Sequence, residues 1–422
     1  MNNMQNAARR APVAGFTNGA PAGVTARAPL YSDWPVGKQS YAELMALHLA
    51  LQLEQSITAQ FIPVLNPVTD LGGVPLAELD VLKRVFARAP ADGSRMMQRA
   101  TSSEIPAVAL KLLGDHLEGM PLPLPAAARR NVGVVQTRNT HIDPAAHVRG
   151  AAHDLLLAGS SWMRDVLTSA DLHKVAVFSP GVDTSLFKPG AKAGHLGQRF
   201  VIFSGGRLAY HKGQDIVIAA VKRFRKRHPE TLLLTLWQSP YPEGAGALAS
   251  TGHTPIAPEF YGTALNVKGW AVANGMPEDA IVDLGVLPPA ALAVVLREAN
   301  VALFPNRAES DANPLLLECM ATGVPVIASR NTGHLDVAHA ELCYPLVEQG
   351  ALRGVAPDGG TDGWGEASVD EIVAHLETIH AQQGAARTKA AAAATWAAAF
   401  GWDQHVPRLM ALLKPLLDQV RG

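Results

Sequence analysis

The second half of the chain alternates between short, continuous apolar runs and segments whose apolar residues recur at helical spacing. The apolar runs predict strands at residues 200–203, 232–237, 281–285, 301–304 and 324–328, and the helical pattern predicts helices at residues 215–227, 289–297 and 314–321. A continuous apolar run indicates a strand that is buried on both faces, as in a parallel sheet. The connections between parallel strands are usually helices, which matches the predicted helices between the runs. We therefore expect a parallel sheet covered by helices.

The first half shows the same alternation less clearly. A helix is predicted at residues 41–53, where Leu44, Leu47 and Leu51 recur at helical spacing, and another at residues 162–167. Strands are predicted at residues 61–64, 132–135, 155–159 and 175–178. The predicted fold class is α/β, with two doubly wound, Rossmann-like domains that meet near residues 180–189.

Four segments follow from this pattern. Residues 1–26 are rich in Ala, Gly, Pro and Asn without periodicity, which predicts a flexible tail. The two domains are expected at residues 27–185 and 186–395. Residues 396–422 form a final helical region, interrupted at Gly401 and Pro407, that we expect to pack towards the N-terminal domain.

Composition and charge exclude some classes of protein and favour others. Of the 422 residues, 48% are hydrophobic and 17% are charged, which excludes wholesale disorder. A formal charge of -1 argues against nucleic acid as a partner. The two cysteines, Cys319 and Cys343, lie in apolar surroundings and favour a reducing compartment. No apolar stretch reaches the ~18 residues of a membrane span, so a cytoplasmic location is predicted.

Common cofactor and metal motifs are missing. No G-x-G-x-x-G follows a predicted strand, so a nicotinamide cofactor has no support. No H-E-x-x-H or C-x-x-C occurs. Three histidines, His141, His147 and His153, are spaced so that successive ones lie on different faces of a helix. We therefore predict no metal site and no cofactor.

The first candidate segment is residues 205–215, between a predicted strand and a predicted helix. It contains Gly206, Arg207, Lys212 and Gly213. Glycines let backbone approach a ligand, and two cations beside a helix N-terminus suit a diphosphate. The alternative is a simple turn with two solvated cations.

The second candidate segment is residues 304–329, a polar, acidic loop followed by a helix. The loop lies at the carboxyl end of a strand, where open α/β sheets bind ligands. Pro314 begins the helix, so its free N–H groups point back at the loop. Glu318 follows in an otherwise apolar helix, and a buried carboxylate needs a partner. A ribose hydroxyl pair would be one such partner, and a salt bridge in the core is the alternative.

Together these segments resemble the retaining GT-B glycosyltransferases of glycosyltransferase family 4. The family's G-R-x-x-x-x-K-G loop matches residues 206–213, and its E-A-M-A-x-G-x-P-V-I pattern matches residues 318–327. Residues 177–189 resemble its interdomain hinge, and Phe400-Gly401-Trp402 its C-terminal signature. The resemblance covers residue 132 to the C-terminus, with four motifs in the family's order. It implies a nucleotide-sugar site in the C-terminal domain and an acceptor site in the N-terminal domain, facing across a cleft.

The resemblance also implies roles for individual residues. Arg207 and Lys212 would neutralise the leaving diphosphate without a metal, and Glu318 would hold the ribose. The donor would also contact Gly206 and the helix start, which comprises Asn313, Pro314, Leu315 and Leu316. Leu287 stands at the nucleobase position, and Gly37 is what remains of the family's N-terminal glycine-rich loop. His141 is matched to the acceptor-side histidine, or is an ordinary polar loop residue.

The acidic loop departs from the family pattern. Eight residues separate Glu309 from Glu318, where the family has seven, and the glycines that usually follow the first acid are absent. Counting without a gap places Ser310 at the sugar-facing position, whereas a bulge places Glu309 there. We choose Glu309, because a carboxylate accepts two sugar hydroxyls at once.

The predicted function is transfer of a sugar from a UDP- or GDP-linked donor to a hydroxyl acceptor, with retention of configuration and no metal. The acceptor class (glycan, lipid-linked sugar or protein) stays open. A sugar-nucleotide epimerase of the same fold and a non-catalytic nucleotide-sugar-binding scaffold are the alternatives. Peripheral contact with the inner membrane face is a further hypothesis, because one stretch is basic. That stretch contains Lys83, Arg84, Arg88, Arg95 and Arg99, but Asp80 and Asp92 favour a solvated helix face.

Overall fold

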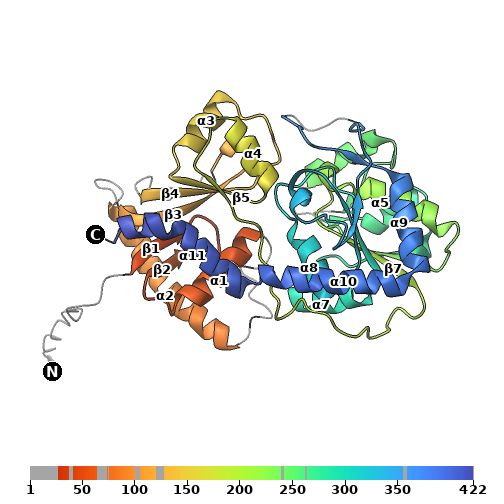
Figure 1. The fold of residues 1–422 in the computed structure, drawn as a ribbon, viewed down its shortest axis with the longest axis horizontal. Helices are drawn as coiled ribbons and strands as arrows, with labels where there is room; N and C mark the ends of the chain where they lie inside the picture. The colour runs from red at the N-terminus through yellow and green to blue at the C-terminus, as the bar shows by residue number, and fades with distance from the viewer. Residues whose placement is uncertain are drawn as a thin grey trace, which may run out of the picture.

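A computed structural model describes residues 27–37, 41–63, 74, 76–99, 105–119, 128–238, 242–261, 264–354 and 359–421. The two six-stranded sheets lie in two lobes side by side, and helices cover the faces of each sheet (Figure 1). Every strand pair within these two sheets is parallel. The predicted tail at residues 1–26 lies outside the described residues.

The N-terminal sheet has the strand order β2-β1-β3-β4-β5-β6. The strands are β1 (Ala28–Ser32), β2 (Ala59–Pro63), β3 (Ile105–Leu113), β4 (Ala128–Val135), β5 (Leu155–Ala158) and β6 (Val175–Val177). The helices are α1 (Tyr41–Leu53), α2 (Leu76–Arg99), α3 (Pro144–Ala151) and α4 (Ser161–Ser169). Strand order reverses between β1 and β3, which makes the carboxyl ends of these strands a topological switch point.

The C-terminal sheet has the strand order β11-β8-β7-β12-β13-β14. The strands are β7 (Phe200–Gly205), β8 (Thr231–Leu236), β11 (Ile281–Asp283), β12 (Val301–Phe304), β13 (Val326–Ser329) and β14 (Tyr344–Leu346). The helices between them are α5 (Gln214–Arg225), α6 (Val267–Ala273), α7 (Pro289–Glu298) and α8 (Pro314–Thr322). Two short antiparallel pairs, β9 (Phe260–Tyr261) with β10 (Ala264–Leu265) and β15 (Gln349–Gly350) with β16 (Glu366–Ala367), complete the strands. Here the order reverses between β7 and β12, so a ligand site is expected after these two strands.

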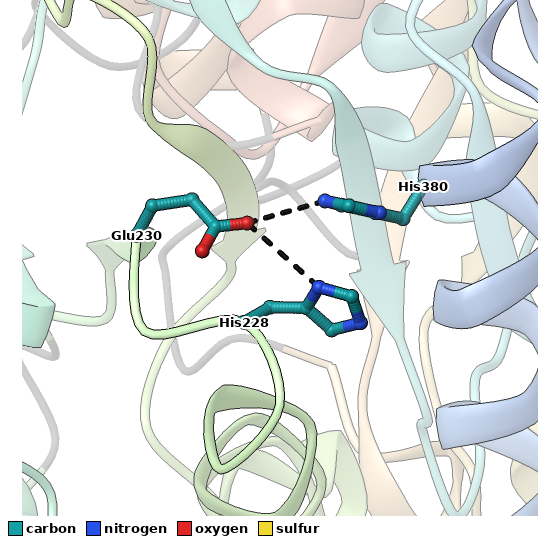
Figure 2. Close-up of side chains that lie close together, drawn as sticks. All are labelled: His228, Glu230 and His380. Atoms are coloured by element: carbon teal, nitrogen blue, oxygen red, sulfur yellow. Dashed lines mark hydrogen bonds and ion pairs between the residues drawn. The ribbon is translucent and has the colours of Figure 1, made fainter.

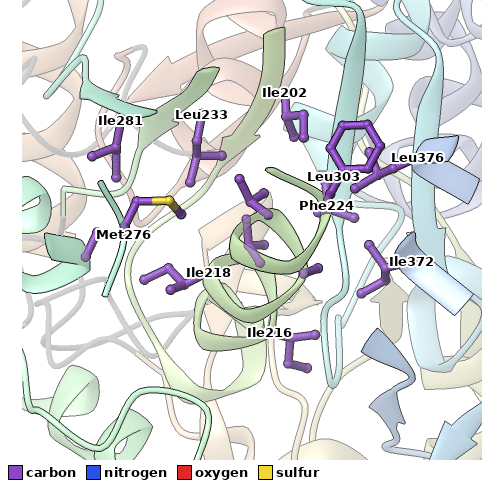
Figure 3. Packing of buried hydrophobic residues seen from close by; sticks show 14 of the residues in the cluster. Ile202, Ile216, Ile218, Phe224, Leu233, Met276, Ile281, Leu303, Ile372 and Leu376 are labelled. Carbon is purple, nitrogen blue, oxygen red and sulfur yellow. The ribbon is translucent and has the colours of Figure 1, made fainter. Parts of the chain in front are cut away.

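Alternate residues of the C-terminal strands enter two different cores, as the period of a strand requires. Ile202, Leu233 and Leu303 pack against α5 with Ile216, Ile218 and Phe224 (Figure 3). Their neighbours in sequence, which include Val201, Phe203, Leu232 and Ala302, pack on the opposite face with residues of α7 and α8. Both faces are therefore buried, which explains the continuous apolar runs in the sequence.

The C-terminal helices link the two domains. α9 (Val369–Ala381) and α10 (Gln383–Ala397) cover the C-terminal domain, and α11 (Trp402–Gln419) lies on the N-terminal domain beside α1 (Figure 1). The apolar face of α11 joins the N-terminal core, with Trp402, Val406, Leu409, Leu413 and Leu417 buried. At the crossing, a Cβ on Gly181 would lie 2.7 Å from the Trp402 ring, so only glycine allows this approach.

The predicted α/β fold class, with a C-terminal helix that returns to the first domain, is confirmed. The expected interruption at Pro407 is wrong, because α11 continues through both Pro407 and Pro415. The basic stretch lies in α2, where Lys83 pairs with Asp80 at 3.0 Å and Arg84 with Glu54 at 3.5 Å. The side chains of Arg88, Arg95 and Arg99 lie outside the described residues. Among the helices that are described, none is both long and apolar enough to cross a membrane.

Candidate functional site at the carboxyl edges of the two sheets

The loop between β7 and α5 is shaped by two glycines with positive φ. Gly206 has a φ of 104°, and Gly213 has a φ of 68° at the N-terminal end of α5. A Cβ on Gly213 would lie 2.3 Å from the carbonyl oxygen of Pro305, so glycine here lets the loops after β7 and β12 touch. Gln214 fixes the loop by donating to the carbonyls of Gly206 (3.2 Å) and Arg207 (2.8 Å). The Arg207 side chain is exposed.

Lys212 and Glu309 form an ion pair between these two loops. The Lys212 side chain is 15% exposed and that of Glu309 is 4% exposed. Asn306 also donates to Glu309 Oε1, and the Glu309 backbone N–H donates to Thr332 Oγ1 at 2.8 Å. Burial is the largest single influence on Glu309 and opposes its ionisation. The charge and hydrogen bond of Lys212, together with smaller contributions from His334 and Arg138, nevertheless hold the pKa of this carboxyl below its usual value. Lys212, the predicted phosphate-binding cation, and Glu309, the predicted sugar-facing acid, are therefore joined in one ion pair.

Ser310 follows directly and is also buried, at 5% exposed. Its backbone carbonyl accepts a 2.9 Å hydrogen bond from Ser160 Oγ of the N-terminal domain. The two candidates for the sugar-facing position thus differ in their partners. Glu309 contacts the predicted diphosphate-binding Lys212, whereas the Ser310 backbone meets the other domain.

The backbone turns through a positive φ at the start of α8. Asn313, the N-cap residue, has a φ of 57°, a value that glycine adopts readily and that asparagine tolerates better than most residues. Its side-chain Nδ2 lies 3.4 Å from Glu309 Oε1 and 3.4 Å from His334 Nε2. Pro314 occupies the first turn of α8. Leu315 packs over β7, because its Cδ2 lies 2.3 Å from where a Cβ on Gly205 would be, and Leu316 is buried.

Glu318 is half-buried in α8. Burial and, secondarily, the negative charge of Asp183 raise the pKa of its carboxyl group to about 8. Within the described part of the chain, its side chain has no hydrogen bond or ion pair. The salt-bridge alternative from the sequence is therefore not what the structure shows, and the carboxyl group can still accept hydrogen bonds from a ligand.

The loop after β4 brings N-terminal residues to this region. Asn139 Oδ1 accepts hydrogen bonds from the backbone N–H groups of His141 (2.8 Å) and Gly360 (2.7 Å). Trp364 Nε1 donates to the Arg138 carbonyl at 3.1 Å. The exposed His141 thus lies at a contact between the two domains. The charge of Arg138 also acts on Glu309 and Asp311 of the acidic loop, a cation that the sequence analysis did not select.

The end of β5 makes a second contact with the acidic loop. A Cβ on Gly159 would lie 2.6 Å from Asp311 Cβ, and the Ser161 backbone N–H donates to Asp336 Oδ2 at 2.7 Å. The loop after β5 meets the loops that follow β12 and β13, and the loop after β4 meets the segment that precedes β16, so the carboxyl edges of the two sheets face one another. Ligands of open α/β sheets bind at these edges.

Gly37 and Leu287 occupy the remaining predicted positions. Gly37 follows β1 at the switch point of the N-terminal sheet and is buried, and a Cβ there would lie 2.3 Å from Glu43 Oε2. Leu287 is half-buried in the loop between β11 and α7 and packs on the core of the C-terminal domain. Neither position has a described contact with the Lys212–Glu309 pair.

Sequence reasoning missed the buried cation beneath the acidic loop. Arg307 is fully buried, makes two hydrogen bonds to Asp215 (2.9 and 2.7 Å) and two to Glu366 (2.6 and 2.8 Å), and covers the Tyr210 ring. It ties the loop that carries Glu309 to the start of α5 and to β16. The only available signal was a charged residue three positions after a buried strand.

Two buried imidazoles were also missed. Burial lowers the pKa of His334 to about 4 and the pKa of His211 well below its ordinary value, so both rings are neutral at pH 7. Within the described residues, His334 Nδ1 and His211 Nε2 have no hydrogen-bond partner.

Comparisons with known proteins bear on the fold and on the relatives of this chain. The sequence matches no model of a protein family. It is 29% identical over 255 residues to the D-inositol 3-phosphate glycosyltransferase of Segniliparus rotundus, covering 59% of this chain and 49% of that protein. It is 27% identical over 293 residues to D-inositol 3-phosphate glycosyltransferase 1 of Catenulispora acidiphila, covering 66% and 62%. The chain thus spans between about half and three fifths of these relatives' length.

Solved structures show the fold. Sucrose-phosphate synthase from Thermosynechococcus elongatus aligns with a TM-score of 0.62 at 15% identity, over 93% of this chain and 100% of that one. Anabaena HepE in complex with UDP aligns with a TM-score of 0.58 at 14% identity, over 92% and 100%. The fold inferred from the motifs is therefore confirmed: the chain has the GT-B fold, and its sequence is similar to curated proteins named as glycosyltransferases.

Proposed function

We propose that this chain transfers a sugar from a nucleotide-sugar donor to a hydroxyl acceptor, with retention of configuration and without a metal ion. The Lys212–Glu309 pair carries the proposal. It joins the loops after β7 and β12, which flank the switch point of the C-terminal sheet, and the charge of Arg138 from the other domain acts on Glu309. A charged pair at this position can hold a diphosphate and a sugar side by side.

Each residue then has a chemical task. Arg207 and Lys212 bind the diphosphate and stabilise its charge as it leaves, which is the role a divalent cation plays elsewhere. Once phosphate engages Lys212, Glu309 can accept hydrogen bonds from the donor sugar. Glu318 accepts hydrogen bonds from the ribose, and His141 contacts the sugar or the acceptor hydroxyl. The protein thereby supplies orientation and electrostatic stabilisation.

UDP-linked sugars are the first donors to test, because HepE was solved with UDP. GDP-linked sugars are the second class of donor to test. D-inositol 3-phosphate, the compound in the relatives' names, is the first acceptor to test, beside glycan, lipid-linked and protein acceptors. Transfer is followed by product chromatography, and the anomeric configuration of the product is read by NMR.

The chelation experiment separates the charge mechanism from metal catalysis. We expect transfer to persist in EDTA, and Lys212→Gln to weaken donor binding with or without added Mn²⁺. Loss of turnover in EDTA that Mn²⁺ restores would contradict the proposal. Conversion of the free nucleotide-sugar without an acceptor would favour an epimerase, and binding without any turnover would favour a scaffold.

A further inference from the structure

Three side chains that can bind a metal converge at a place remote from the candidate donor site. His228 and Glu230 lie between α5 and β8, and His380 lies in the last turn of α9 (Figure 2). A segment that runs from a helix into a parallel strand lies at the amino edge of the sheet. The candidate donor site lies at the carboxyl edge, so the two places are on opposite sides of the C-terminal domain.

The ligand atoms lie near the spacing that a tetrahedral metal requires. His380 Nε2 lies 3.2 Å from Glu230 Oε1, and His228 Nδ1 lies 3.8 Å from the same oxygen. One ligand atom from each of the three residues lies within 4.8 Å of the others. Zinc bonds of about 2.0–2.1 Å at tetrahedral angles place ligand atoms about 3.3 Å apart. Small side-chain rotations would therefore bring all three onto one ion.

The two imidazole rings are held in place before any ion binds. His228 Nε2 lies 2.9 Å from Glu377 Oε2, and Arg227 pairs with the other oxygen of Glu377 at 2.7 Å. A carboxylate on the second ring nitrogen is the usual support for a metal-binding histidine, because it orients the ring and makes it more basic. Here it leaves Nδ1 facing Glu230 and His380.

Apolar packing restricts the rings further. The His228 ring stacks on Phe224 at 4.4 Å between centroids, and the His380 ring meets the edge of Phe200 at 5.0 Å. The two imidazoles themselves lie 4.1 Å apart. Both phenylalanines belong to the core of the domain. A site on rigid elements loses little conformational entropy when it binds an ion.

We propose that His228, Glu230 and His380 bind a divalent transition-metal ion, with Zn²⁺ as the best match to two imidazoles and one carboxylate. Water would complete the tetrahedron, since three protein ligands leave one position open. The ion joins α9 to the segment before β8, and therefore stabilises this side of the domain rather than taking part in transfer. Glu230 and His380 are 150 residues apart, which is why no local motif indicated the site.

The test uses the full chain, stripped with a chelator and free of any affinity tag. Equilibrium dialysis against Zn²⁺ is expected to show one saturable equivalent, and Tm is expected to rise with Zn²⁺ concentration. His380→Ala and Glu230→Gln should abolish both effects. His173→Ala is the matched control, because His173 is an exposed histidine beside an acidic residue, Asp171, on the other domain.

Glu377→Gln tests the support of the ring without removing a ligand. It should weaken Zn²⁺ binding by about 10- to 100-fold, the usual cost of losing such a partner. Co²⁺ should give the absorption spectrum of a tetrahedral site in the parent protein but not in His380→Ala. The proposal is overturned if saturable binding is absent, or if the variants bind Zn²⁺ as the parent does. Equal Tm values of parent and variants without metal show that loss of binding is not loss of folding.

Discussion

Donor binding should depend on pH through Glu318. Burial raises the pKa of this carboxyl group to about 8 in the free protein, so it carries a proton at pH 7. Ribose hydroxyls donate to a carboxylate, so the complex favours the ionised form and the proton is released on binding. Below pH 8 the apparent affinity should then fall, approaching tenfold per pH unit, and the loss amounts to about 16-fold between pH 8, where the group is already half protonated, and about pH 6.5.

Calorimetry with UDP-glucose measures both the donor affinity and the number of protons released on binding. Titrations at about pH 6.5 in buffers of different ionisation enthalpy should show close to one proton released. Glu318→Gln is the matched control and should bind more weakly with a flat pH profile. Above about pH 6.5 Asp311, whose pKa burial raises to about 6, is mostly ionised, so the pH dependence there comes mainly from Glu318. An affinity that is constant over this range, or a profile that Glu318→Gln leaves unchanged, would refute the reasoning.

Three further predictions concern the acidic loop and its surroundings. Glu309→Gln should reduce transfer strongly while UDP affinity changes little, because the carboxylate is assigned to the sugar; if Ser310→Ala is the damaging change in the same assays, the ungapped alignment is right. His141→Ala should lower kcat more than it changes donor binding, the pattern of a contact made in the transition state, and an unchanged kcat would reduce His141 to a loop residue. Arg307→Met should lower the free energy of unfolding in urea by about 3–5 kcal/mol, since it leaves buried carboxylates without their cation; a loss under about 1 kcal/mol would show that they relax.

The sequence determined the elements whose faces are both buried. In the C-terminal sheet, continuous apolar runs such as the one at β12 (Val301–Phe304) reveal the strands, because no polar face interrupts them. The strands β1 (Ala28–Ser32) and β3 (Ile105–Leu113) were missed, since Pro29, Pro106 and Lys111 break their apolar pattern. The sequence also predicted the loops of the candidate site, because Gly206, Gly213 and Pro314 are typical of turns and helix starts.

Only the tertiary structure decided which of these loops meet. Lys212 and Glu309 are 97 residues apart, and they pair because the loops after β7 and β12 lie beside each other where the strand order reverses. The positive φ of Asn313 likewise depends on how the acidic loop enters α8. Periodicity and turn residues act over a few positions and can be read along the chain. Pairing between distant loops depends on strand order and on the packing of two domains, which no single segment encodes.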